Sequence, residues 1–163
     1  MIEPVKRLET ISIFAAFKND RPTLDKIAAI MHVEHFPQDS YIIKEGDSGE
    51  VMFILNKGTI RIEKETLSND KFTVVNLRDD MNIFFGEVAL MDNDVRSASV
   101  FAITPVECFS IRKTDFERVC DADPRIGYYV IKEIVKSLSG RLRKTTQDSV
   151  NLIAALISDE SDN

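Results

Sequence analysis

Residues 36 to about 113 divide into short β-type segments separated by turn signals, and this pattern restricts the fold more than any other feature. Residues 59–63 alternate polar and apolar side chains with a period of two, which is typical of a strand with one buried face. Glycine-containing turns at 45–49 and 56–58 separate the segments. Many short strands at this spacing favour an antiparallel β-roll, jelly-roll-like or cupin-like, over alternating βαβ units.

Helical patterns lie on both sides of the β-rich stretch. Residues 1–35 read as N-terminal helices, and 114–158 as C-terminal helices in which proline is absent beyond the start. We therefore expect an α+β fold with one domain over residues 1–158, in which a β-roll at 36–113 connects the N-terminal helices to a long C-terminal helix. Residues 159–163 form an acidic tail. The apolar positions that carry the N-terminal helical pattern are Leu24, Ile27, Ala28 and Met31.

Composition excludes several functional classes. The 163-residue chain has a net charge of −6, so a general attraction to nucleic acid is not expected. Cys108 and Cys120 are too few for a disulfide framework, which indicates reduced thiols in a cytoplasmic protein. No apolar run approaches the roughly 20 residues that cross a bilayer. His32 and His35 lack further ligands at metal spacing, and no catalytic motif occurs, so we expect neither a metal site nor an enzyme.

Residues 84–100 contain the groups of an anion site. Gly86 permits close backbone approach, and the short apolar segment after Glu87 offers backbone amides to an anion. Arg96 adds a planar cationic fork. The Glu87 carboxylate would repel a bare phosphate but can accept hydrogen bonds from a sugar hydroxyl. Each residue alone is more often a turn or a surface charge, but together they suit a phosphate joined to a ribose.

This stretch resembles the phosphate-binding cassette of the cyclic nucleotide-binding domain family, which includes the bacterial catabolite activator protein and the regulatory subunits of cyclic AMP-dependent kinase. The family pattern Phe-Gly-Glu-(aliphatic)-Ala-Leu, then Arg-(Ala/Ser/Thr)-Ala-(Ser/Thr)-Val, is matched by residues 85–90 and 96–100. Residues 42–47 and 53–58 resemble the family's two glycine turns. One feature differs, because relatives carry Gly-Asp directly before the cassette, whereas residues 78–84 form a longer link without glycine.

The resemblance implies roles for the cassette residues. Glu87 would bind the ribose hydroxyl, and Arg96 with the amides near Val88 and Ala89 would bind the cyclic phosphate. Ser97 would help to hold the phosphate or face the purine. Relatives that prefer cyclic GMP often have Thr at that position and those that bind cyclic AMP often have Ala or Ser, so we expect cyclic AMP as the ligand and weaker binding of cyclic GMP. The other expected ligand contacts are Phe85, Gly86 and Val74.

The long C-terminal helix carries a predicted dimer interface. Between residues 131 and 156, apolar and small side chains recur in alternating steps of four and three, a heptad seam that suggests a parallel homodimer. The alternative is one stripe that packs on the chain's own roll. By resemblance to the family's bacterial activator, Ser158 would contact the base as part of a lid, which would couple ligand binding to the position of the helix.

The implied function is a non-catalytic cyclic nucleotide sensor or regulatory module that acts on a downstream effector protein or output domain through its C-terminal helix. The chain ends near the point where the activator's DNA-reading domain begins, so no DNA binding by this chain is expected. Two alternatives stay open. One is a degenerate roll that serves only as a dimerisation or interaction domain without nucleotide. The other is a small cupin-like enzyme, which the shortage of histidines disfavours.

Overall fold

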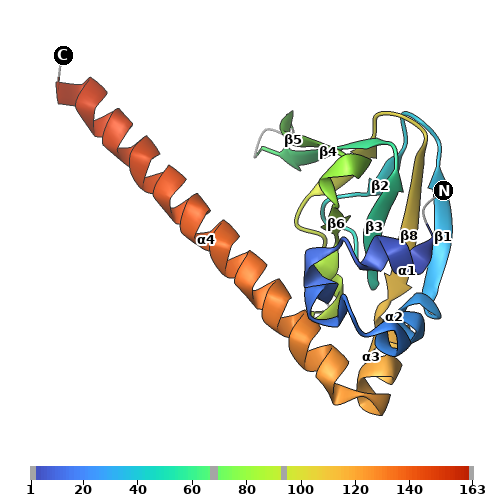
Figure 1. The fold of residues 1–163 in the computed structure, drawn as a ribbon. Coiled ribbons are helices and arrows are strands. Elements are labelled where there is room, and N and C mark those ends of the chain that lie inside the picture. The colour runs from blue at the N-terminus through green and yellow to red at the C-terminus, as the bar shows by residue number, and fades with distance from the viewer. Residues whose placement is uncertain (1–2, 67–69, 93–94, 162–163) are drawn as a thin grey trace.

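The N-terminal part of the computed structural model is helical (Figure 1). The structure describes residues 3–66, 70–92 and 95–161. Its first helix-like elements are α1 (Pro4–Leu8), the 3₁₀ helix η1 (Ser12–Phe17) and α2 (Arg21–Ala28). α2 begins where the Asp20 carboxylate accepts a hydrogen bond from the Thr23 backbone N–H at 3.2 Å, as an N-cap does. Leu24 and Ile27 of α2 are fully buried, as the helical pattern predicts.

The described strands form two four-stranded sheets, and each ladder within them is antiparallel. One sheet has the order β1-β8-β3-β6 and the other β2-β7-β4-β5. This arrangement with its flanking helices confirms the predicted α+β roll. The strands are β1 (Met31–Phe36), β2 (Tyr41–Ile43), β3 (Val51–Lys57), β4 (Thr59–Glu65), β5 (Lys71–Arg78), β6 (Phe84–Phe85), β7 (Ser99–Ala102) and β8 (Val106–Arg112).

The predicted N-terminal helical zone is wrong at its C-terminal end, because residues 31–35 belong to strand β1. Met31 pairs with Ile111 of β8, and Phe36 pairs with Val106. β8 is buried along nearly its whole length, so its backbone N–H and C=O groups need partners on both sides. β1 supplies those partners on one side. This long-range requirement outweighs the local helical spacing that includes Met31.

The central strands are buried on both faces, so the hydrophobic core consists of two clusters, one on each face of the first sheet. Along β3, Met52 and Ile54 pack with the helices, whereas Phe53 and Leu55 point into the roll. Alternate residues of β8 divide in the same way. One hydrophobic cluster therefore joins the helices to the first sheet, and a second fills the space between the sheets.

The C-terminal helices continue directly from the roll. They are α3 (Lys113–Ala122) and the 38-residue α4 (Pro124–Ser161), which at 1.5 Å per residue is about 57 Å long. Ile126, Val130 and Ile134 of α4 are buried against the domain. Leu138 also packs on this cluster, and the C-terminal half of α4 then leaves the roll and ends far from it (Figure 1). Among the described residues, no helix is long and apolar enough to cross a membrane.

α4 also changes the predicted C-terminal boundary. The expected acidic tail begins at residue 159, but the helical backbone continues through Ser161. The last two residues of that tail, 162 and 163, lie outside the described part of the chain.

Candidate functional site

The cassette begins with strand β6 and the 3₁₀ helix η3 (Glu87–Leu90), which Gly86 connects. Gly86 has a φ of +71°, a left-handed conformation that glycine adopts at little cost. A Cβ atom at this position would lie 2.8 Å from Arg96 Nη1 and 3.2 Å from the Val51 carbonyl oxygen. The Ala89 N–H donates to the Gly86 carbonyl at 3.2 Å and closes the first turn. A side chain at residue 86 would therefore both strain the backbone and displace the arginine.

Arg96 lies in a cradle formed by backbone. Its guanidinium donates to the Val51 carbonyl at 2.8 Å and to the Gly86 carbonyl at 3.3 Å. A Cβ atom at Gly49 would lie 2.6 Å from the guanidinium carbon, so this glycine leaves the space that the arginine fills. Partial burial lowers the pKa of Arg96, and the nearby Glu87 carboxylate raises it in part. The site thus holds a cation that is partly removed from water, where it attracts an anion more strongly.

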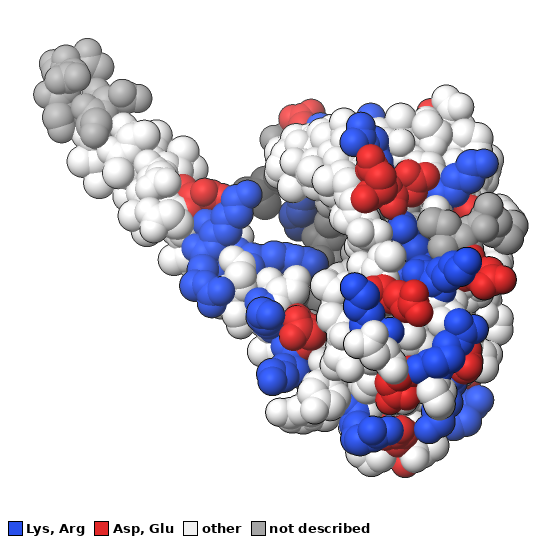
Figure 2. All heavy atoms as spheres, in the orientation of Figure 1, with Lys and Arg blue, Asp and Glu red and all other residues white. Residues whose placement is uncertain are grey.

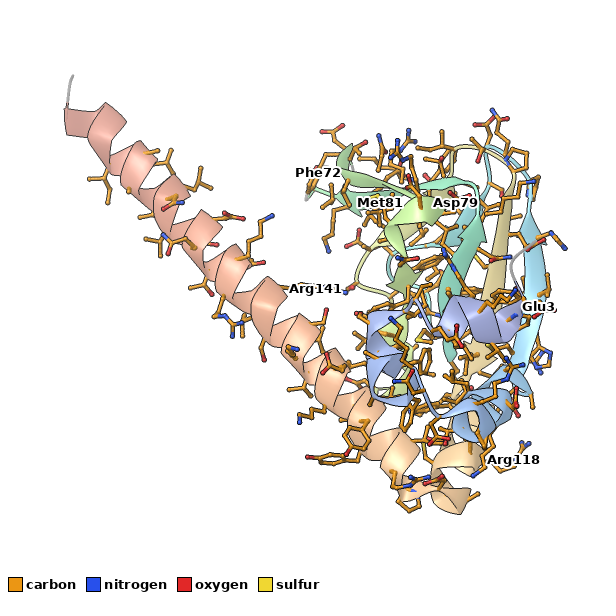
Figure 3. All side chains as sticks on the ribbon, viewed as in Figure 1. Glu3, Phe72, Asp79, Met81, Arg118 and Arg141 are labelled. Atoms are coloured by element: carbon orange, nitrogen blue, oxygen red, sulfur yellow. The ribbon has the colours of Figure 1, made fainter. Side chains whose placement is uncertain are left out.

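Glu87 is a buried carboxylate with a cationic partner on the long helix. Its side chain is only 3% exposed, and Arg141 Nη2 of α4 lies 2.9 Å from Glu87 Oε1. No described donor points along a hydrogen-bond direction at that oxygen, so the contact is a charge pair. In Figure 3 the labelled Arg141 extends from α4 toward the roll. Basic side chains gather on the middle part of α4 (Figure 2).

Arg141 is not among the residues that the sequence predicts for the site. The signal that could have found it is helical spacing, because Arg141 is seven residues after the buried Ile134 and so lies on the same side of α4. A surface arginine is ordinarily paired with solvent or with a neighbour on its own helix. Its pairing with Glu87 depends on how the helix packs on the roll.

Four other residues are predicted to contact the ligand, and each has its own environment in the structure. Ser97 is exposed, and its carbonyl accepts a hydrogen bond from Lys64 Nζ at 2.6 Å. Phe85 stacks on Phe53 inside the core, with ring centroids 5.4 Å apart, so it could offer a ligand only its backbone. Val74 lies on the edge strand β5 with 53% of its surface exposed. Ser158 lies in α4, but its side chain is outside the described structure.

The two residues of η3 whose amides are predicted to bind the phosphate differ in their exposure to solvent. Ala89 is 6% exposed, and its N–H already donates to the Gly86 carbonyl. Val88 is 38% exposed.

The described structure shows no cluster of three or more metal-ligating side chains. His32 lies 3.9 Å from the Asp115 carboxylate, and His35 lies 3.8 Å from the Glu107 carboxylate.

A comparison of the sequence with known protein families identifies the family of this chain. The cyclic nucleotide-binding domain model matches residues 33–123, more than half of the chain. The chain therefore belongs to the cyclic nucleotide-binding domain family, as its cassette motif predicts.

Individual proteins resemble the chain in sequence or in fold. The chain is similar to human cGMP-dependent protein kinase 2, with 30% identity over 142 residues that cover 86% of the chain and 17% of the kinase. The fold resembles Thermus thermophilus catabolite activator protein, with a TM-score of 0.71, 23% identity and coverage of 82% and 60%. It also resembles the regulatory domain of Toxoplasma gondii PKA with cAMP, with a TM-score of 0.70, 22% identity and coverage of 83% and 48%.

Proposed function

We propose that this domain binds a cyclic nucleotide at its cassette and acts as a regulatory module without catalytic activity of its own. The observation that carries the proposal is the buried Glu87 carboxylate beside Arg96, whose guanidinium fills a cradle left by two glycines. A ribose hydroxyl can donate to Glu87, while the Arg96 fork and the N–H of the exposed Val88 can bind the phosphate. Two unpaired thiols, Cys108 and Cys120, support a cytoplasmic location.

We propose cyclic AMP as the preferred ligand and cyclic GMP as a weaker one. The support is Ser97 at the position after the cassette arginine, where family members that prefer cyclic GMP often carry Thr. The kinase relative is named for cGMP and the Toxoplasma structure for cAMP, so both ligands need testing. Calorimetry with each nucleotide should give the lower Kd for cyclic AMP, and Ser97→Thr should narrow the difference. An equal or lower Kd for cyclic GMP in the unsubstituted protein contradicts the preference.

Binding itself is tested by removing the phosphate partner. Arg96→Ala should weaken binding by about 2–5 kcal/mol, the range for loss of one partner from a buried charge pair. Glu87→Ala should also weaken binding through the ribose hydroxyl. Arg143→Ala is the matched control, because this arginine is exposed on α4. No heat and no melting shift with either nucleotide would refute the proposed function.

The proposed output passes through α4 to an effector protein or a further domain. Arg141 connects the helix to Glu87, so a ligand at that carboxylate would alter the attachment of α4 to the roll. We also propose that Ser158 closes over the base as a lid. Removal of residues 145–163 should then raise the Kd for cyclic AMP, and Ser158→Ala should raise it in the same direction. An unchanged Kd after both changes contradicts the lid.

We propose a parallel homodimer through the heptad seam of α4. The support is exposure, because Leu142, Leu152 and Leu156 are 68%, 63% and 58% exposed. A partner helix would remove them from water. Light scattering should give the mass of a dimer, and Leu142→Asp should reduce it to a monomer. Gln147→Asp is the control, since at 100° per residue it faces away from the seam. A monomer mass for the unsubstituted protein, with and without nucleotide, refutes the dimer.

The same exposed seam also supports the second candidate function, dimerisation without nucleotide. Ligand titration during light scattering separates the two. A dimer that forms without any measurable nucleotide binding favours the degenerate roll, whereas nucleotide binding favours the sensor.

A further inference from the structure

A buried arginine outside the cassette connects the first helix to the loop that leads into the cassette. Arg7 of α1 is only 3% exposed although it carries a charge. Its Nη2 donates to the Asp79 carbonyl at 2.7 Å, and its Nη1 donates to Asn82 Oδ1 at 3.1 Å. Its Nε donates at 3.0 Å to the carbonyl of Leu55, the residue of β3 beside this loop. One side chain therefore joins three separate segments of the chain.

The loop held by Arg7 is the long link before the cassette that distinguishes this chain from the family pattern. It contains the 3₁₀ turn η2 (Asp79–Met81), followed by Asn82 with a φ of +54°. The Asp79 carboxylate accepts a hydrogen bond from the Gly58 N–H at 2.9 Å, which fixes the start of the loop. Asn82 is the only residue of this loop in the left-handed region, which costs less for Asn than for most residues but more than for glycine.

The end of the loop sets the position of the cassette. Directly after Asn82, the Leu55 N–H donates to the Ile83 carbonyl at 2.9 Å. β6 then pairs with β3, with Phe84 opposite Ile54 and Phe85 opposite Phe53, and Gly86 follows. Arg7 and the ladder both bind the backbone of Leu55, Arg7 at its carbonyl and Ile83 at its N–H. Because Asn82 directly precedes Ile83, the backbone conformation at Asn82 sets how the chain enters the ladder. A change of Asn82 from positive to negative φ would shift the register in which the residues of β6 pair with β3.

We propose that Arg7 is a positioning residue for the cassette: it holds Asn82 in the left-handed conformation and thereby sets the register in which β6 presents Gly86 and Glu87. The consequence for ligand affinity rests on the proposed function, whereas the consequence for the loop does not. A buried arginine with purely structural value would stabilise the whole domain evenly. A positioning residue affects the segment from η2 to η3 more than the rest.

Hydrogen exchange tests the loop without any ligand. In Arg7→Met, the amides of residues 83–89 should exchange at least tenfold faster than in the unsubstituted protein, while those of β8 change much less. Lys6→Met is the control, because Lys6 is exposed on the same helix, and it should change neither. An equal increase in both segments means global destabilisation and overturns the proposal, as does no change at residues 83–89.

Rescue at Asn82 tests the mechanism through affinity for cyclic AMP. Arg7→Met should raise the Kd at least tenfold, and adding Asn82→Gly should recover threefold or more of that loss, because glycine adopts positive φ without the arginine. Asn82→Ala alone, which keeps Arg7, should raise the Kd, so the proposal stays testable if Arg7→Met does not fold. No rescue, or an unchanged Kd in Asn82→Ala, overturns it. If the unsubstituted protein does not bind cyclic AMP or cyclic GMP, the proposed function fails and the exchange result alone decides on Arg7.

Discussion

Removal of the Arg141 charge should destabilise the domain by separating α4 from the cassette. The change is Arg141→Gln, which keeps a long polar side chain but removes the cation that lies 2.9 Å from Glu87 Oε1. Arg143→Gln is the matched control on the same helix, because Arg143 is also exposed. Both variants lose one positive charge, so a difference between them reports on the contact with Glu87.

The size of the effect follows from the unequal exposure of the two side chains. Two unit charges 4 Å apart interact by about 4 kcal/mol at an effective dielectric constant of 20. Exposed ion pairs contribute only about 0–1 kcal/mol, whereas removing one partner of a fully buried pair costs about 3–5 kcal/mol. Glu87 is 3% exposed and Arg141 is 58% exposed, so this pair falls between those cases. Arg96 also remains near Glu87. We therefore expect a loss of about 1–2 kcal/mol.

Chemical and thermal unfolding measure this loss. For a domain of this size, about 1 kcal/mol corresponds to roughly 2–4 °C, so Arg141→Gln should lower Tm by about 2–8 °C and Arg143→Gln by much less. The difference should shrink in 1 M salt, because ions screen the half-exposed arginine. Equal Tm values for the two variants would refute the inference that this pair stabilises the attachment of α4.

Three further predictions follow from single residues. Gly49→Ala should reduce cyclic nucleotide affinity tenfold or more by displacing Arg96, whereas Gly140→Ala, which meets no atom within 4 Å, should not; calorimetry compares them. The Arg125 side chain holds the pKa of Asp123 at about 2, so its stabilisation is present above about pH 4 and disappears as the pH falls through 2. In Asp123→Asn, the loss of unfolding free energy between about pH 4 and pH 2 should be smaller than in the unsubstituted protein, and an equal loss contradicts this. Burial raises the pKa of Cys108 to about 12, so a thiol reagent at pH 8 should label it only after denaturant is added, and rapid labelling of the native protein contradicts this.

Short-range patterns were sufficient for most of the fold. The alternation along residues 59–63 identifies a strand because side-chain direction in a strand depends only on neighbouring residues. Leu24 and Ile27 identify a helix for the same reason. Met31 has the same helical spacing but lies in β1, because the pairing requirement of β8 is a property of a distant segment.

The cassette shows the same division. Its sequence alone determined the motif, the need for glycine at residue 86 and the presence of a cation and a carboxylate, since these depend on residue type and close spacing. Only the tertiary structure decided that Phe85 faces the core, that Arg141 reaches Glu87 and that Arg7 holds the loop before the cassette. Arg7 and Asn82 are 75 positions apart in sequence. A contact across such a distance depends on how helices and sheets pack, and no local pattern of residues encodes that packing.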